Sequence, residues 1–104
     1  LDMKEGFVYM LSNSKRTVLY TGVSGDLVNR TFNHKKSNGS VFSTKYRTHF
    51  LMYYEVHQNM YEAIRREKQI KRWNKEWKLN LIRSVNPEMK DLWKEILPPG
   101  RVHF

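Results

Sequence analysis

Short apolar runs dominate the first half of the chain, and apolar residues at helical spacing dominate the second half. The segments 6–13 and 17–22 are rich in β-branched and aromatic residues, and a polar turn at 13–16 joins them, which predicts a β-hairpin. The segment 49–56 has a nearly continuous apolar run, typical of a buried strand, and favours a central place in the sheet. We therefore expect three strands in one small sheet.

A helix is predicted between the second and third strands. Ser24 or Asp26 can cap it by accepting a hydrogen bond from a free backbone N–H of the first turn. Its apolar face would consist of Leu27, Val28, Thr31 and Phe32. The following stretch, 37–48, mixes hydroxyl and basic residues without an apolar period, and we expect a loop there.

Helices are also predicted after the third strand. One spans Tyr61 to Trp73, and a further helical stretch runs to about Ser84. The face of this second stretch would be formed by Trp73, Trp77, Leu79, Leu81 and Ile82. A short final helix is expected over 86–96, with Asn86 as its cap and Pro87 in its first turn. Its packing residues would be Met89, Leu92, Trp93 and Ile96.

These elements predict a single α/β domain, built as a small three-stranded, mostly antiparallel sheet flanked by helices. The length of 104 residues suits one domain with one core. We expect an N-terminal extension over 1–5, the domain over 6–96, and a Pro- and Gly-containing C-terminal tail over 97–104.

One acidic residue interrupts the apolar stripe of the first helix after the third strand. The stripe consists of Met60, Ala63, Ile64, Ile70 and Trp73, and Glu67 falls in its middle. A buried carboxylate is costly unless a cation pairs with it or a metal binds it. The local cations available on the same helix are Arg66, Lys68 and Lys71.

The net charge of the chain indicates which class of partner it binds. The chain carries 19 Lys and Arg against 10 Asp and Glu, a formal net charge of +9. This surplus favours a polyanionic partner, with nucleic acid first and an anionic membrane surface second. The chain has no cysteine, and its four histidines lack zinc-ligand spacing. Neither a membrane-length apolar run nor a signal peptide is present, so we expect a cytoplasmic protein.

Five polar residues fall where side chains should be constrained. Tyr9 and Tyr20 lie in the first and second strands, and Arg30 and His34 share one helix face because they are one turn apart. Glu67 lies in the apolar stripe. A phenol, a guanidinium, an imidazole and a carboxylate from separate elements can converge at one end of the sheet, although spacing alone does not prove that they meet.

This ordered set resembles the GIY-YIG nuclease family. The first half of the motif corresponds to "FVY" at 7–9 and the second half to "YTG" at 20–22. Arg30 and His34 follow at the family spacing. Glu67, on a helix after the third strand, matches the acidic residue that binds a divalent metal in the family.

The resemblance extends from about Gly6 to Trp93, nearly the whole chain. The ending "WKLNLIRSVNPEMKDLW" resembles the small bacterial single-domain branch, which is related to the nuclease domain of the excision-repair incision subunit. Some relatives carry an Asn after the metal-binding Glu. Asn80 stands near that offset, but the segment 73–77 makes the alignment unsafe, and we leave Asn80 out of the site.

The chain departs from the family motif at several positions. Phe7 and Val8 replace the Gly and Ile of the first half, and Thr21 replaces the Ile of the second. We interpret these as packing changes, with Gly22 giving the chain room to turn. Val23 stands where some relatives have Lys, and others place a Tyr where His34 stands.

The resemblance implies phosphodiester hydrolysis with one divalent cation, Mg²⁺ or Mn²⁺, held by Glu67. Arg30 would pair with phosphate oxygens as they gain charge. The resemblance places Tyr9 near the attacking water and Tyr20 on the phosphate. His34, or a phenol with a lowered pKa, would take the proton from water. The identity of the base stays open.

Each of these residues also has a structural interpretation. Tyrosines in strands are usually core residues whose hydroxyls find a partner, and Arg30 with His34 would ordinarily form a solvated helix face. Only the joint occurrence in family order favours function. We expect Lys35, Lys36 and Lys45 to contact nucleic-acid phosphates, because they lie near the proposed site.

Two further groups of residues resemble the family or contribute charge. Tyr46 and the run 53–55 also resemble the family, and we interpret them as core and site support. The Lys and Arg side chains between 65 and 78 are interpreted as a solvated face, some of it usable for DNA phosphates.

The leading hypothesis is a metal-dependent endonuclease that hydrolyses DNA with little sequence specificity, in repair or recombination. Structured or damaged DNA would be the substrate, with no small-molecule substrate and no membrane partner. The alternative is a nucleic-acid-binding module of the same fold that cleaves weakly or not at all. A basic scaffold that binds an acidic protein partner is a third hypothesis. The oligomeric state and the natural substrate stay open.

Overall fold

The structure, a computed structural model, describes residues 4–36 and 41–97. Its elements are β1 (Gly6–Ser12), β2 (Leu19–Ser24), α1 (Leu27–Lys35), α2 (Val41–Tyr46), β3 (Phe50–His57), α3 (Met60–Lys71), α4 (Lys75–Val85) and α5 (Trp93–Ile96). The predicted C-terminal tail lies outside the described residues except for Leu97, as do the first three residues of the predicted N-terminal extension.

The three strands form one antiparallel sheet in the order β2-β1-β3. The α/β class and the predicted hairpin are confirmed, but β2 continues beyond Gly22 to Ser24. The prediction that the third strand is central was wrong, since β1 holds that place. The apolar run of β3 instead reflects cover on both faces and along its edge. The loop before α5 covers that edge, where Leu92 N–H donates to Leu51 O at 2.8 Å.

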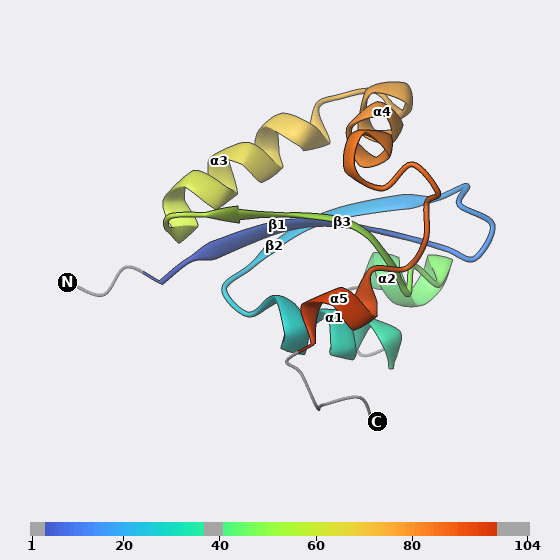
Figure 1. Cartoon of the computed structure of the whole chain (residues 1–104), viewed down its shortest axis with the longest axis horizontal. Helices are drawn as coiled ribbons and strands as arrows, with labels where there is room; N and C mark the ends of the chain where they lie inside the picture. Colours follow the sequence, from blue (N-terminus) through green and yellow to red (C-terminus); the bar gives the residue numbers. More distant parts are fainter. Residues whose placement is uncertain (1–3, 37–40, 98–104) are drawn as a thin grey trace.

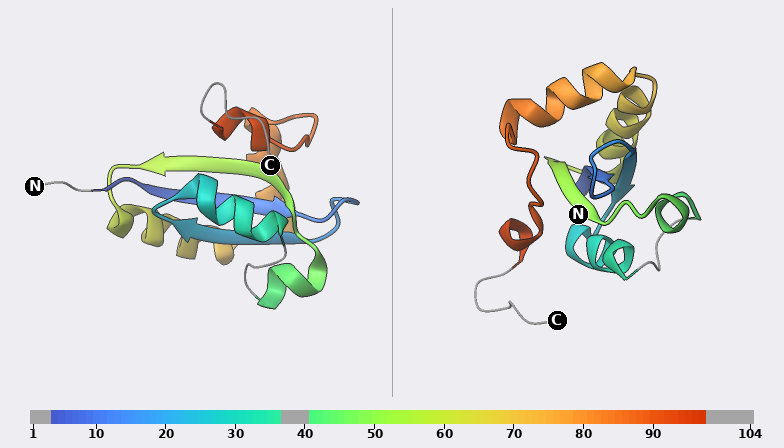
Figure 2. Two further views of the ribbon diagram at one scale, coloured as in Figure 1. Left: turned by 90° about the horizontal axis from the view of Figure 1, so that it is seen from below. Right: turned by 90° about the vertical axis from the view of Figure 1, so that its right-hand side faces the viewer.

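Helices cover both faces of the sheet. Figure 1 shows α3 and α4 on one side and α1, α2 and α5 on the other, and the two rotated views in Figure 2 agree. None of the helices in the described ranges is both long and apolar enough to cross a membrane. The alternation of side chains along β1 therefore sends successive residues into two different layers.

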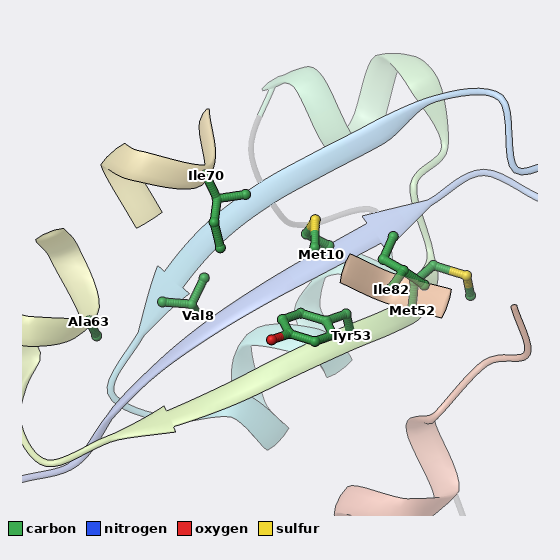
Figure 3. Packing of buried hydrophobic residues seen from close by; sticks show 7 residues of the cluster. All are labelled: Val8, Met10, Met52, Tyr53, Ala63, Ile70 and Ile82. Carbon is green, nitrogen blue, oxygen red and sulfur yellow. The ribbon is translucent and has the colours of Figure 1, made fainter. Parts of the chain in front are cut away.

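The layer between the sheet and α3–α4 is a continuous apolar core (Figure 3). Its buried members are Val8, Met10, Met52, Tyr53, Ala63, Ile70 and Ile82. The opposite layer contains Tyr9, Leu11, Leu27, Leu51 and Leu92. Tyr9 is thus the one phenol of the central strand that points toward α1, between two core residues that point toward α3.

Short polar side chains fix where the helices begin. Asp26, not Ser24, caps α1 by accepting from Asn29 N–H at 3.1 Å. Asn59 and Asn74 cap α3 and α4 in the same way. The predicted register of α3 is confirmed, because Ala63, Glu67 and Ile70 are its buried residues.

Three predictions about helices were wrong. The expected loop 37–48 contains α2. The final helix is only Trp93–Ile96, because Asn86 ends α4 as its C-cap and its buried side chain donates to Met52 O and Lys90 O. Trp77 was expected to pack, but 57% of it is exposed, and it touches Trp73 edge-on.

A polar cluster ties α3 to β3 at the sheet edge away from β2. Glu55 accepts hydrogen bonds from Tyr53 at 2.5 Å and from Arg66 Nε at 3.1 Å, and it pairs with His57 at 2.8 Å. Burial opposes its ionisation, but these bonds, chiefly that of Arg66, outweigh burial and lower the pKa of Glu55. Tyr53 and Glu55 therefore support α3 on the opposite face of the sheet from Tyr9, whereas Tyr54 packs on the Tyr9 side.

Candidate active site

The hydroxyl of Tyr9 lies between two side chains of α1. Arg30 Nε–H donates to the Tyr9 oxygen at 3.2 Å, and His34 Nε2 lies 3.3 Å from the same oxygen. Arg30 has only N–H donors, so the consistent arrangement has Tyr9 accepting from Arg30 and donating its own proton to His34. This chain of three polar groups connects the central strand to α1.

The register of α1 brings Arg30 and His34 to Tyr9. The Asp26 cap fixes the start of the helix, and one helical turn separates the two residues, so both face the sheet. His34 is completely buried, so the alternative of a solvated helix face does not hold for it. Arg30 is half-buried and can still reach solvent.

His34 is held neutral at physiological pH. The pKa of His34 is lowered to about 4, mainly by burial and also by the positive charges of Arg30 and His49. His49 Nδ1–H donates to the backbone carbonyl of His34 at 2.6 Å. Sequence reasoning placed His49 only at the start of a strand, and nothing in its local pattern distinguishes it.

Tyr20 completes an aromatic cluster around the Tyr9 hydroxyl. Its ring centroid lies 6.3 Å from that of Tyr9 and 5.3 Å from that of His34. Hydrogen bonding to Tyr9 is the largest influence that raises the pKa of Arg30, and Tyr20 contributes in the same direction. Four of the five predicted residues, from β1, β2 and α1, are therefore neighbours.

Gly22 makes room for the Tyr9 ring. The two residues are partners across β1 and β2, and a Cβ atom on Gly22 would lie 2.5 Å from both Cζ and the hydroxyl oxygen of Tyr9. The expectation that this glycine lets the chain turn was wrong, because it lies inside a continuous strand. Its missing side chain is what lets the phenol reach Arg30.

Glu67 reaches this group through its charge rather than through a bond. It is 8% exposed on the inner side of α3, and its ion pair is with Lys71, at 2.7 Å. Burial is the main cause that raises the pKa of Tyr9, and the negative charge of Glu67 adds to it, against the opposing hydrogen bond of Arg30. Within the described residues no ion pair joins Glu67 to Arg30.

The expectation that Tyr9, Arg30 and Glu67 border one open pocket was wrong. Tyr9 is completely buried and Glu67 nearly so, which leaves Arg30 as the member that solvent reaches. The buried hydroxyl of Tyr9 is cut off from water, and Arg30 and His34 supply the hydrogen-bond partners that it needs.

The oxygen atoms available to a metal are few. The residues 4–36 and 41–97 contain no group of three or more His, Cys, Asp or Glu side chains able to hold an ion. A single carboxylate still fits Mg²⁺, which keeps several waters and takes further oxygens from a phosphate. Thr21, on the α3 side of the sheet like Glu67, has a buried hydroxyl without a hydrogen-bond partner. The single carboxylate of Glu67 therefore suits one hydrated cation, provided that Lys71 releases it.

The three lysines expected to contact phosphates differ in their surroundings. Lys35 pairs with Asp91 at 2.6 Å and donates to His49 O at 2.8 Å, so it fastens α1 to the loop before α5. Lys36 lies over the Phe32 ring, and Lys45 lies over the ring of Tyr46. Both lysines are exposed. Tyr46, expected in the core, is 41% exposed.

Acidification is expected to destabilise the fold through His34. The folded protein lowers the pKa of this imidazole from 6.5 to about 4, so the unfolded chain binds more protons across that window. Stability therefore falls as pH drops from 6.5 toward 4, by up to about 3 kcal/mol. Urea unfolding of the wild type and His34→Gln at several pH values measures the difference.

Other groups that titrate in the same pH range, including Glu55, are present in both proteins. Their contributions therefore cancel in the stability difference between wild type and His34→Gln. The stability difference between wild type and His34→Gln should shrink steadily as the pH falls. Parallel pH profiles in the two proteins would contradict the burial of a neutral imidazole at this position.

Comparison with known proteins assigns the fold to a family. The model of the GIY-YIG catalytic domain matches residues 5–80. The UPF0213 proteins of Staphylococcus aureus strains Mu3 and Mu50 are each 33% identical to this chain over 82 residues, which is 79% of this chain and 99% of each relative. No solved structure matches the chain significantly. The three-stranded antiparallel sheet with its helices agrees with this family. The chain therefore belongs to the GIY-YIG family of nucleases, whose substrates are nucleic acids.

Proposed function

We propose that this protein is a metal-dependent endonuclease that hydrolyses DNA phosphodiester bonds with little sequence specificity. The observation that carries the proposal is the Tyr9 hydroxyl held between Arg30 and a neutral His34, inside a domain of the nuclease family. A protein that only binds DNA has no need for a buried phenol connected to an imidazole.

Arg30 is the residue that a phosphate meets first. It is half-buried, and its guanidinium has further N–H donors beside the Nε that bonds Tyr9. Paired with the scissile phosphate, it would neutralise the charge that grows on the phosphate oxygens in the transition state. Movement of the guanidinium from Tyr9 to the phosphate would also uncover the phenol.

Tyr9 and His34 provide a route for the proton of the attacking water. Tyr9 alone is a poor base, because burial raises its pKa, but it can take a proton from water while donating its own to His34 Nε2. A bound phosphate next to the pair would favour the protonated imidazole by opposite charge. Tyr20 borders both rings, which supports the role that we propose for it, to orient the phosphate.

Glu67 is the candidate metal ligand. When bound there, a divalent cation supplies positive charge for the phosphate and leaving oxygen and cancels the negative charge that now raises the pKa of Tyr9. Lys71 holds the carboxylate when no cation does, which avoids an unpaired buried charge.

The substrate would be recognised by its backbone and shape. The net charge of +9 favours nucleic acid, and the segment matched by the family model fills most of the chain. Structured or damaged DNA in repair or recombination is the setting that we propose, in the cytoplasm. The same fold as a binding module with little or no cleavage is the alternative, and the Lys71–Glu67 pair is the observation that favours it.

Cleavage of supercoiled plasmid and branched DNA with Mg²⁺ or Mn²⁺ tests the proposal. We expect nicking that needs the metal and is lost in both Arg30→Ala and Glu67→Ala. Arg83→Ala is a matched control, because this exposed arginine on α4 has a single ion pair among the described residues, with Glu76 at 3.5 Å. DNA binding without any cutting, or folded Arg30 and Glu67 variants that cut like the wild type, would refute the nuclease function.

A further inference from the structure

The outer face of α3 carries a stripe of basic residues that the proposed active site does not use. Arg65, Lys68 and Arg72 are all exposed there, on the side of the helix away from Ala63 and Ile70. Arg65 has a long contact with Glu62 at 3.4 Å, a weak pair at an exposed position. Among the described residues, no carboxylate pairs with Lys68 or Arg72.

The stripe is continuous with the proposed active site. Successive residues are rotated by about 100° around a helix, so Lys71, Lys68 and Arg72 follow Glu67 in that order around α3. Lys71 is itself the ion-pair partner of Glu67. A nucleic-acid strand bound at Glu67 can therefore continue around α3 along a row of positively charged side chains.

The stripe leads to a hollow of about 350 Å³ at the end of α3. Arg65, Lys68, Gln69, Arg72 and Trp73 line it, so an aromatic ring lies among three cations. Trp77, on α4, contacts Trp73 with ring centroids 6.1 Å apart and an interplanar angle of 77°. Figure 1 shows α4 following directly at this end of α3.

Two further observations indicate that the junction of α3 and α4 suits a ligand that carries both phosphates and aromatic bases. Trp77 is 57% exposed, a large apolar surface to leave in water. Lys78 has a lowered pKa, mainly through burial and also through the nearby positive charge of Lys71. Exposed cations of α3 beside an exposed indole fit phosphates together with bases.

We propose that the outer face of α3 and its corner with α4 bind a single-stranded DNA segment, with phosphates on Arg65, Lys68 and Arg72 and a base stacked on Trp77. A duplex offers phosphates, but its bases are stacked on one another and unavailable to an indole. A single strand uses both the cations and the ring. That this strand is the flank of the cleaved substrate rests on the proposed function.

Binding of a labelled single-stranded oligonucleotide in EDTA, measured by fluorescence anisotropy at several salt concentrations, tests the surface without cleavage. The triple variant Arg65→Gln, Lys68→Gln, Arg72→Gln should lower the salt slope by about 2, since each phosphate contact on a single strand contributes about 0.7. The matched control removes three exposed charges elsewhere, at Lys4, Lys15 and Lys94. It should keep most of the slope and affinity.

Trp77→Ala should weaken single-strand binding about tenfold, the usual range for one stacked base, and change duplex binding little. Trp77→Tyr should retain most of the affinity, because tyrosine also stacks. Equal losses of single-strand affinity in the two triple variants would show that only net charge matters. Unchanged binding by Trp77→Ala would show that no base stacks on this side chain. Either result overturns the proposal.

The test separates this surface from the nuclease function. A protein that cuts plasmid with metal while its α3 triple variant binds single strands normally would disprove the surface and keep the nuclease. A protein that never cuts but shows the expected losses on α3 and Trp77 would keep the surface and disprove the nuclease.

Discussion

Replacing Tyr9 by phenylalanine is expected to lower the rate of metal-dependent plasmid nicking by about 10²–10⁴-fold, the usual contribution of a positioned proton-transfer group. The substitution keeps the ring against Gly22 and removes only the oxygen that Arg30 and His34 share. The water would then have no proton acceptor connected to the imidazole. Single-turnover nicking assays, with enzyme in excess over plasmid, measure the chemical step directly.

Tyr53→Phe is the matched control for this change. Tyr53 is also a buried phenol in the sheet, and its hydroxyl donates to Glu55 at 2.5 Å on the face of α3. Tyr9→Phe removes two hydrogen bonds and Tyr53→Phe removes one, and each variant should lose about 1–3 kcal/mol of stability. Only Tyr9→Phe should lose nicking. Equal activity in the two variants would show that Tyr9 has a structural role alone.

Some features of the candidate site can be predicted from the sequence, and others depend on the tertiary fold. The spacing of Arg30 and His34 predicts a shared helix face, and the stripe around Glu67 predicts its burial, because both follow from the helical period. That Arg30 and His34 meet Tyr9 depends on how α1 crosses the sheet, which no local pattern specifies. The contact of His49 with the His34 carbonyl is likewise a product of the tertiary fold.

The errors in the fold have a common physical origin. The apolar run of β3 predicts a central strand, but burial on both faces requires only helices on both faces, and Asp91 and Leu92 close the edge. Asn86 has the composition of a helix start, yet its buried amide bonds Met52 O and ends α4 instead. In each case a long-range contact decided between two states that the local sequence allows equally.

The charge on α3 illustrates the same limit. Among the candidate partners Arg66, Lys68 and Lys71, Glu67 pairs with Lys71, because residues four apart face each other on a helix. Arg66 pairs with Glu55 on β3 instead, and Lys68 lies exposed on the outer face. The pairing on each side of the helix thus determines which cations are available to a nucleic acid.

Gly22→Ala is expected to abolish most nicking activity and to destabilise the protein by about 1–3 kcal/mol, the usual cost of an added methyl group in a packed interior. The new Cβ would lie 2.5 Å from Cζ and the hydroxyl of Tyr9, so the phenol must move. Because Tyr9 is fully buried, the ring cannot shift without leaving Arg30 or His34. Urea unfolding and plasmid nicking measure the two effects.

Two other glycines separate loss of stability from loss of the site. A Cβ on Gly6 would lie 2.7 Å from the Ala63 side chain, so Gly6→Ala should destabilise the contact between β1 and α3 while leaving the Tyr9 hydroxyl in place. Among the described residues, a Cβ on Gly25 would meet a single atom, Met60 Sδ, at 3.8 Å, and Gly25→Ala should change neither property. If Gly6→Ala and Gly22→Ala lose activity in proportion to stability alone, the close fit of Gly22 to Tyr9 has no catalytic importance. If Gly22→Ala loses far more activity at equal stability, the missing Cβ is part of the active site.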